Sequence, residues 1–133
     1  MRPQALVVGA GAGLSASLAR LLAAEGYAVA LAARHVEKLR PLAAETGATL
    51  HGCDAADPAA MAALFAAIPA PEVAIYNASF RVRGPVVSLD PAEVRRALDI
   101  TAFGAFLMAR EAAARMEAAG RGTILFTGAS AGV

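Results

Sequence analysis

The 133-residue chain has no tryptophan, few aromatic residues and one cysteine, Cys53. A single cysteine forms no disulfide and no paired-cysteine metal site within one chain, so we expect a reducing compartment, the cytoplasm. An excess of one charge is also missing, because 12 basic and 11 acidic residues leave a net charge of +1. Such a balance provides no field that would attract nucleic acid or a membrane surface. We therefore expect small molecules or proteins as partners.

Long uninterrupted apolar segments are absent as well. The uncharged stretches are rich in alanine and are broken by glycine, proline or serine, which is not the pattern of a membrane span. Glycine also interrupts the apolar patch near the amino terminus, which disfavours an export signal. The length suits one domain with its own core, and we expect that domain to cover residues 1–133.

Strand and helix patterns alternate along the chain. Short apolar runs predict strands, and segments with apolar residues at helical spacing predict helices between them. Asp57 and Asp90, each followed by proline, are suited to begin two of the helices. The predicted strands are 5–9, 27–33, 48–54, 72–79 and 123–127; the predicted helices are 15–26, 35–47 (starting late or interrupted at Pro41), 57–68 and 91–119. This alternation predicts an α/β fold with a doubly wound parallel sheet and helices on both faces.

Glycines separate the first predicted strand from the first predicted helix. Gly9, Gly11 and Gly13 precede Ser15. The spacing Gly-x-x-x-Gly-x-Gly fits Gly9 and Gly13 and has Ser15 in its last place, whereas Gly-x-Gly-x-x-Gly fails at Leu14. Residues without bulk allow the amides of a helix start to approach a diphosphate. The turn is thus interpreted as a nucleotide-binding loop, and a glycine-rich turn without a ligand is the alternative.

Landmarks along the whole chain resemble those of one family. The segment 7–34, Asp54 after the third predicted strand, the YNAS sequence that ends at Ser79, and GTILFTGASAG at 122–132 occur in order. Together they resemble the successive motifs of short-chain dehydrogenases/reductases. The resemblance implies a Rossmann-type sheet that binds NAD or NADP, and hydride transfer between nicotinamide and a carbonyl or alcohol substrate.

Arg34 indicates which cofactor is bound. In the family resembled, an acidic residue after the second strand holds the ribose of NAD, whereas arginine binds the additional phosphate of NADP. Ala33 occupies the acidic place and Arg34 follows it, so NADP is favoured over NAD; a solvated surface charge is the alternative. A methyltransferase of similar topology is disfavoured, because such enzymes usually carry an acidic residue here.

The resemblance implies the remaining cofactor contacts. Asp54 would accept a hydrogen bond from the adenine amino group, or else share the capping of the next helix with Asp57. Asn77 matches the asparagine of an Asn-Ala-Gly turn beside the nicotinamide ribose, or is a purely structural turn residue. The full set expected to bind the cofactor is Gly9, Ala12, Gly13, Leu14, Ser15, Arg34, Asp54, Ala55, Asn77, Ala78 and Ser79.

The catalytic residues match the family less well. Its Tyr-x-x-x-Lys pair is absent from these 133 residues, since neither Tyr27 nor Tyr76 has a lysine four positions later. The asparagine of the family's long helix falls on Thr101. The catalytic serine falls on Ala129 or, with a shift of one residue, on Ser130, which we prefer because it is the hydroxyl available in this turn.

Two functions are compatible with this pattern. The first is the amino-terminal portion of a longer NADP-dependent oxidoreductase, inactive alone, whose last strand would be an exposed edge if nothing followed it. The second is a non-catalytic NADP-binding sensor or regulatory protein. The segment 91–119 resembles the family's dimer helix and predicts a homodimer or homotetramer, unless its small residues pack only on their own sheet. Those small residues are Gly104, Ala105, Ala109 and Ala112.

Overall fold

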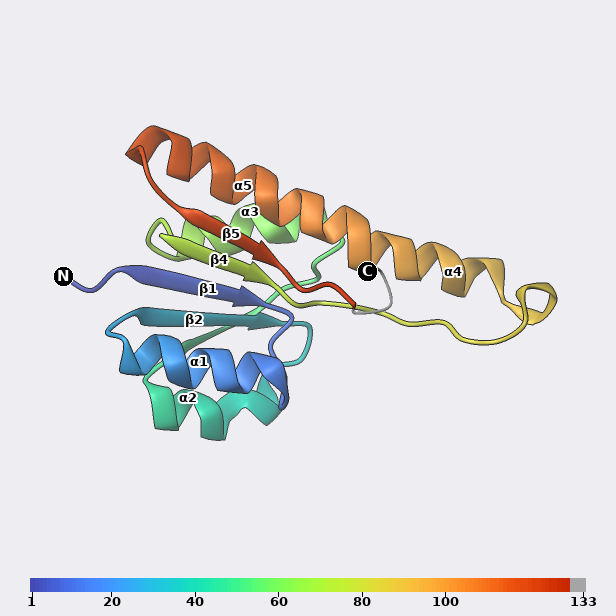
Figure 1. The fold of residues 1–133 in the computed structure, drawn as a ribbon, viewed down its shortest axis with the longest axis horizontal. Helices are drawn as coiled ribbons and strands as arrows, with labels where there is room; N and C mark the ends of the chain where they lie inside the picture. Colours follow the sequence, from blue (N-terminus) through green and yellow to red (C-terminus); the bar gives the residue numbers. More distant parts are fainter. Residues whose placement is uncertain (130–133) are drawn as a thin grey trace.

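A computed structural model describes residues 1–129 and shows a five-stranded parallel sheet (Figure 1). The strand order is β3-β2-β1-β4-β5, so the connections run in opposite directions from β1. The strands are β1 (Gln4–Val8), β2 (Ala28–Ala33), β3 (Thr49–Gly52), β4 (Val73–Tyr76) and β5 (Thr123–Phe126). The predicted doubly wound α/β fold is confirmed. A sheet of this kind binds ligands at the carboxyl ends of its strands, beside the reversal between β1 and β4.

Helices cover both faces of the sheet. On one face lie α1 (Leu14–Ala24), the short η1 (Glu37–Leu39) and α2 (Arg40–Thr46), and on the other lie α3 (Pro58–Ala67) and α5 (Gly104–Ala119). The sheet has a hydrophobic core on each face, and successive residues of β1 point into opposite cores. Leu6 enters one and Val7 the other, and both side chains are fully buried. This two-sided burial explains why the strands read as continuous apolar runs.

The predicted helix starts are confirmed in the structure. Asp57 caps α3 by accepting a hydrogen bond from the Ala59 amide at 3.1 Å. Asp90 caps α4 (Pro91–Leu98) through the Ala92 amide at 3.0 Å. The segment 35–47 becomes helical late, since α2 begins at Arg40 with its proline in the first turn.

The single long helix predicted over 91–119 is wrong in one respect. Between α4 and α5, residues 99–103 form a π-helical turn, η3 (Asp99–Phe103). The Tyr76 hydroxyl donates a hydrogen bond to the Ile100 carbonyl, which lies within this turn. Gly104 follows, and a Cβ there would overlap the Tyr76 hydroxyl and lie 2.9 Å from the Ala55 carbonyl oxygen. Contacts with distant parts of the chain therefore accompany the irregular turn.

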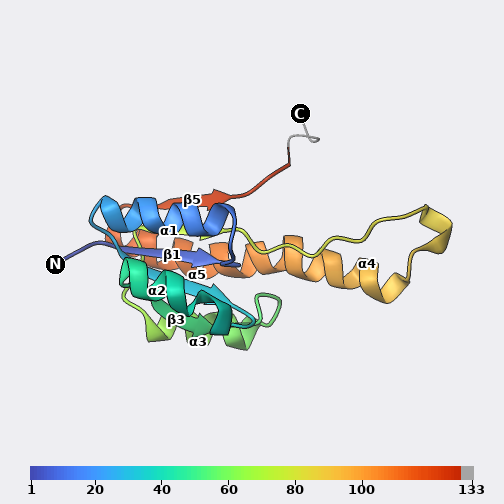
Figure 2. The same cartoon turned by 90° about the horizontal axis from the view of Figure 1, so that it is seen from below.

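The segment that leads into α4, which includes η2 (Val86–Ser88), extends with α4 beyond the carboxyl ends of the strands (Figures 1 and 2). β5 lies at the edge of the described sheet, where Leu125 and Phe126 are about half exposed, at 48% and 56%. None of the helices described for residues 1–129 is long and apolar enough to cross a membrane.

Candidate cofactor-binding site

A cleft of about 810 Å³ opens where four strands end. Residues that follow β1, β2, β3 and β4 line it, as the topology requires. Seven of the residues predicted to bind the cofactor lie in its wall: Gly9, Arg34, Asp54, Ala55, Asn77, Ala78 and Ser79. The structure adds others that the sequence analysis did not single out, among them His35, Lys38, Phe80, Arg96 and Ile100. The strand ends thus bring together most of the predicted set.

Four predicted cofactor residues lie outside that wall. Ala12 borders an adjoining pocket of about 340 Å³, which the glycine loop and the residues around η1 enclose. Gly13 is the residue that caps α1, Leu14 is half exposed, and Ser15 is buried. Contact between these residues and a cofactor stays a prediction, and it would involve their backbone amides.

The start of α1 fits a pyrophosphate. No side chain caps this helix, and the Ala16 amide donates to the Gly13 carbonyl at 3.1 Å. The amides of Leu14 and Ser15 are left for another acceptor, and the helix dipole favours an anion there. A Cβ built at Gly11 or Gly13 would meet nothing within 4 Å, which leaves open space above the turn.

Gly9 is required for a different reason. Its φ is +87°, and a Cβ would overlap the Ala78 backbone nitrogen and lie 2.7 Å from the Asn77 carbonyl carbon. Glycine is needed here because the loop after β4 packs directly on it. The glycines of this turn therefore serve two purposes: close packing at Gly9 and open space at the helix start.

Ser15 points into the protein. Its side chain is almost completely buried, with 1% exposed. The hydroxyl donates to the Gly9 carbonyl at 3.2 Å and accepts a hydrogen bond from Nδ2 of Asn77 at 2.6 Å. The backbone N–H of Asn77 also donates to the Val8 carbonyl at 2.8 Å. Ser15 and Asn77 thus connect the glycine loop to the loop after β4, a pairing that the sequence analysis did not foresee.

Basic side chains gather at the end of β2. Arg34 and His35 are exposed, and Lys38 lines the same cleft. Within residues 1–129, no carboxylate lies at ion-pair distance from Arg34. An unpaired guanidinium in a cleft suits an anionic ligand group.

Asp54 also borders the cleft, and the structure excludes a capping role for it. Its Oδ1 accepts a hydrogen bond from the Ala56 amide at 3.1 Å, which closes a local turn ahead of α3. Asp57 alone caps that helix. The alternative in which Asp54 shares the capping is therefore wrong, whereas its contact with adenine stays a prediction.

Of the two predicted catalytic positions, the described residues include only Thr101. Thr101 is exposed in η3, and its Oγ1 accepts a hydrogen bond from the Phe80 amide at 3.3 Å. Ser130 lies outside the described residues. No group of three or more metal-ligating side chains occurs among residues 1–129.

Two buried side chains that can lose a proton, Cys53 and Tyr76, lie at the carboxyl ends of β3 and β4. Burial raises the pKa of the Cys53 thiol to about 11, with the negative charges of Asp54 and Asp57 adding to the effect. Burial likewise raises the pKa of Tyr76 to about 12, with further contributions from Cys53 and Asp54. Both groups are therefore protonated at neutral pH, and neither provides a base there.

Comparisons with known proteins agree with this geometry. A family model described as short chain dehydrogenase matches residues 3–133. The chain belongs to the short-chain dehydrogenase family. The predicted family and the predicted fold are therefore both confirmed.

Three solved structures of this family are similar over nearly the whole chain. A short-chain dehydrogenase from Rhodopseudomonas palustris is 32% identical with a TM-score of 0.91, and the match covers 98% of this chain and 66% of that protein. A short-chain type dehydrogenase/reductase from Mycobacterium marinum is 28% identical with a TM-score of 0.91, at 98% and 57% coverage. A metagenomic short-chain oxidoreductase solved with NADP is 33% identical with a TM-score of 0.83, at 93% and 61% coverage. This chain therefore spans less than two thirds of the length of each of the three proteins.

Proposed function

We propose that this chain forms the cofactor-binding part of an NADP-dependent oxidoreductase that acts on a carbonyl or alcohol. The observation that carries the proposal is the position of Arg34, directly after β2, in a cleft that Gly9 and Ala10 of the glycine loop also line. Family membership favours an enzyme over the non-catalytic alternative. The similar metagenomic oxidoreductase solved with NADP supports the choice of cofactor.

Each part of the cleft would hold a different part of the cofactor. The amides at the start of α1 would bind the pyrophosphate, and Arg34 would bind the 2′-phosphate that distinguishes NADP from NAD. Asp54 would accept from the adenine amino group, and Asn77, Ala78 and Ser79 would border the nicotinamide ribose. When bound, NADP supplies or accepts the hydride.

Calorimetry with NADP, NAD and S-adenosylmethionine tests the proposal. We expect the unaltered chain to prefer NADP, and Arg34→Ala to weaken NADP binding by roughly tenfold or more while NAD binding changes little. Arg40→Ala is the matched control, because it removes the same charge from an exposed position outside the cleft. Unchanged NADP affinity in Arg34→Ala would contradict the cofactor assignment, and preferential binding of S-adenosylmethionine would indicate a methyltransferase.

We also propose that the chain associates with itself through η3 and the start of α5. Phe103 and Phe106 are 42% and 55% exposed, and their rings stack with centroids 6.2 Å apart. Gly104 and Ala112, predicted to allow close helix contact between chains, are instead buried against their own core. The exposed aromatic pair is therefore the better candidate for contact. Phe106→Glu should shift the sedimentation coefficient toward the monomer, and an unchanged oligomeric state would refute this contact.

A further inference from the structure

We propose that Arg96 is a second residue that recognises the 2′-phosphate of NADP, together with Arg34. This inference rests on the proposed function and assigns a role to a residue of α4, whereas the sequence analysis placed the choice of cofactor at the end of β2 alone. It makes Arg96 a residue that determines cofactor specificity.

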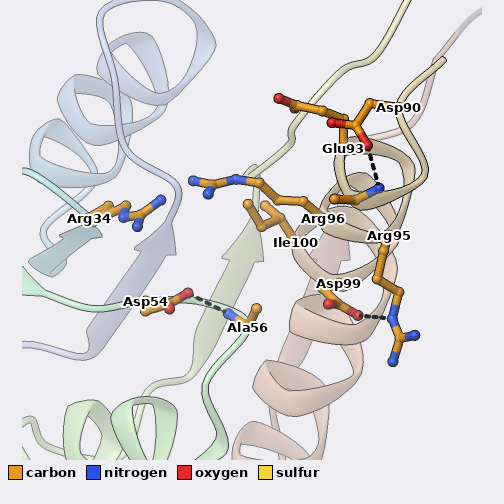
Figure 3. A pocket seen from close by; sticks show the side chains of 10 residues that line it. Arg34, Asp54, Ala56, Asp90, Glu93, Arg95, Arg96, Asp99 and Ile100 are labelled. Atoms are coloured by element: carbon orange, nitrogen blue, oxygen red, sulfur yellow. Dashed lines mark hydrogen bonds and ion pairs between the residues drawn. The ribbon is translucent and has the colours of Figure 1, made fainter. Parts of the chain in front are cut away.

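The two arginines approach the cleft from different elements. Both line the main cleft and also a smaller adjoining cleft of about 410 Å³, which α4 borders. Figure 3 shows their guanidinium groups pointing toward each other across the opening, with Asp54 below them. A ligand that extends from the end of β2 toward α4 would pass between the two groups.

Five carboxylates line the two clefts, and three of them have other partners; the five are Glu37, Asp54, Asp90, Glu93 and Asp99. Asp90 caps α4, and Asp99 pairs with Arg95 at 3.4 Å. Asp54 has one oxygen bonded to the Ala56 amide. Within residues 1–129, no acidic side chain lies at ion-pair distance from either Arg34 or Arg96. Two like charges that face each other without a counterion favour an anion between them.

An aromatic ring positions Arg96. Its guanidinium carbon lies 4.9 Å from the centroid of the Phe80 ring, within the range of a cation–π contact. The backbone of Phe80 is connected to η3, because its amide donates to Oγ1 of Thr101 at 3.3 Å. This contact restricts the long arginine side chain, so less conformational freedom is lost when it binds a ligand.

The chemistry of the ligand fits this arrangement. A phosphate monoester is a dianion near neutral pH, with several strong acceptor oxygens, and planar guanidinium groups bind it through paired charge-assisted hydrogen bonds. NAD carries a neutral hydroxyl at the same position. Arg96 should therefore stabilise NADP much more than NAD.

The test compares Arg96→Ala with Arg95→Ala in the full 133-residue chain. Both residues are exposed on α4 and carry the same charge, but Arg95 is paired with Asp99 and lines only the smaller cleft. We expect Arg96→Ala to weaken NADP binding by roughly tenfold while NAD binding stays within about twofold, and Arg95→Ala to change neither. Adenosine 2′-monophosphate should follow NADP, and adenosine 5′-monophosphate should follow NAD. Calorimetry provides the dissociation constants, and circular dichroism checks that each variant is folded.

Other outcomes overturn the inference and leave the proposed function intact. An equal loss of NADP and NAD affinity in Arg96→Ala would show that Arg96 contacts the shared adenosine part. Unchanged NADP affinity, with a loss only in Arg34→Ala, would show that Arg34 recognises the phosphate alone. By contrast, failure of the unaltered chain to bind either dinucleotide would overturn the proposed function itself.

Discussion

The side chains of Asn77 and Ser15 form a direct hydrogen bond, with Nδ2 of Asn77 2.6 Å from Oγ of Ser15. The same hydroxyl donates to the Gly9 carbonyl at 3.2 Å. The loop after β4 is thereby connected to the turn after β1, on the two sides of the reversal in strand order. Serine in the last place of the glycine pattern therefore leaves the turn intact, because its hydroxyl is satisfied inside the protein.

This link should stabilise the fold. Ser15→Ala leaves the Asn77 amide and the Gly9 carbonyl without that partner in a buried position, so the free energy of unfolding should fall by about 1–3 kcal/mol. Ser17→Ala is the control, since Ser17 is exposed on the same helix. Urea unfolding measures both variants. If Ser15→Ala is as stable as Ser17→Ala, the hydrogen bonds contribute nothing to stability.

The glycines of the turn should respond differently to substitution. Gly9→Ala places a methyl group against the Ala78 backbone and requires a positive φ, so we expect a loss of roughly 3 kcal/mol or more. Gly13→Ala adds a methyl group in open space and should change the stability little. Because that space is where a pyrophosphate would lie, Gly13→Ala should nevertheless weaken NADP binding. Thermal unfolding and calorimetry separate the two effects, and a stable Gly9→Ala protein would contradict the packing argument.

The sheet and the cleft were predictable because they depend on local patterns. Continuous apolar runs identify strands buried on both faces, and parallel strands place their carboxyl ends at one edge. Arg34 could be assigned to the cleft for this reason, since it directly follows β2. Asp57 and Asp90 could be identified as caps, because a cap depends on residues within one turn.

The other features depend on contacts between distant segments. The inward direction of the Ser15 hydroxyl follows from the approach of the loop that carries Asn77, which the spacing of glycines does not encode. The π-helical turn accompanies contacts of Tyr76 with Ile100 and Gly104, although the apolar pattern of 91–119 is that of one continuous helix. Arg96 lines the cleft because the segment before α4 runs out beyond the strand ends and α4 leads back toward them (Figure 1), and no local signal predicts this.

Gly104 and Tyr76 should be energetically coupled. Gly104→Ala would push against the Tyr76 hydroxyl and the Ala55 carbonyl, so it should destabilise the protein by about 1–3 kcal/mol. Tyr76→Phe removes the hydroxyl and leaves the Ile100 carbonyl without its donor. In the double variant the missing hydroxyl relieves part of the clash, so the combined loss should be less than the sum of the two by about 0.5 kcal/mol or more. Additive losses in a double-mutant cycle would show that the Ala55 backbone alone excludes a side chain at this position.

Stability should fall in strongly alkaline solution because of Cys53 and Tyr76. Burial raises their pKa values to about 11 and about 12, from ordinary values of 9.0 and 10.0. The unfolded chain therefore loses these protons at lower pH than the folded chain does, and ionisation favours unfolding. The part of the stability that depends on these two protonated groups is fully present below pH 9 and is lost as pH rises to about 12. Urea unfolding across this range should show a shallower decline for the Cys53→Ala, Tyr76→Phe double variant. An equally steep decline in that variant would assign the alkaline sensitivity to other groups.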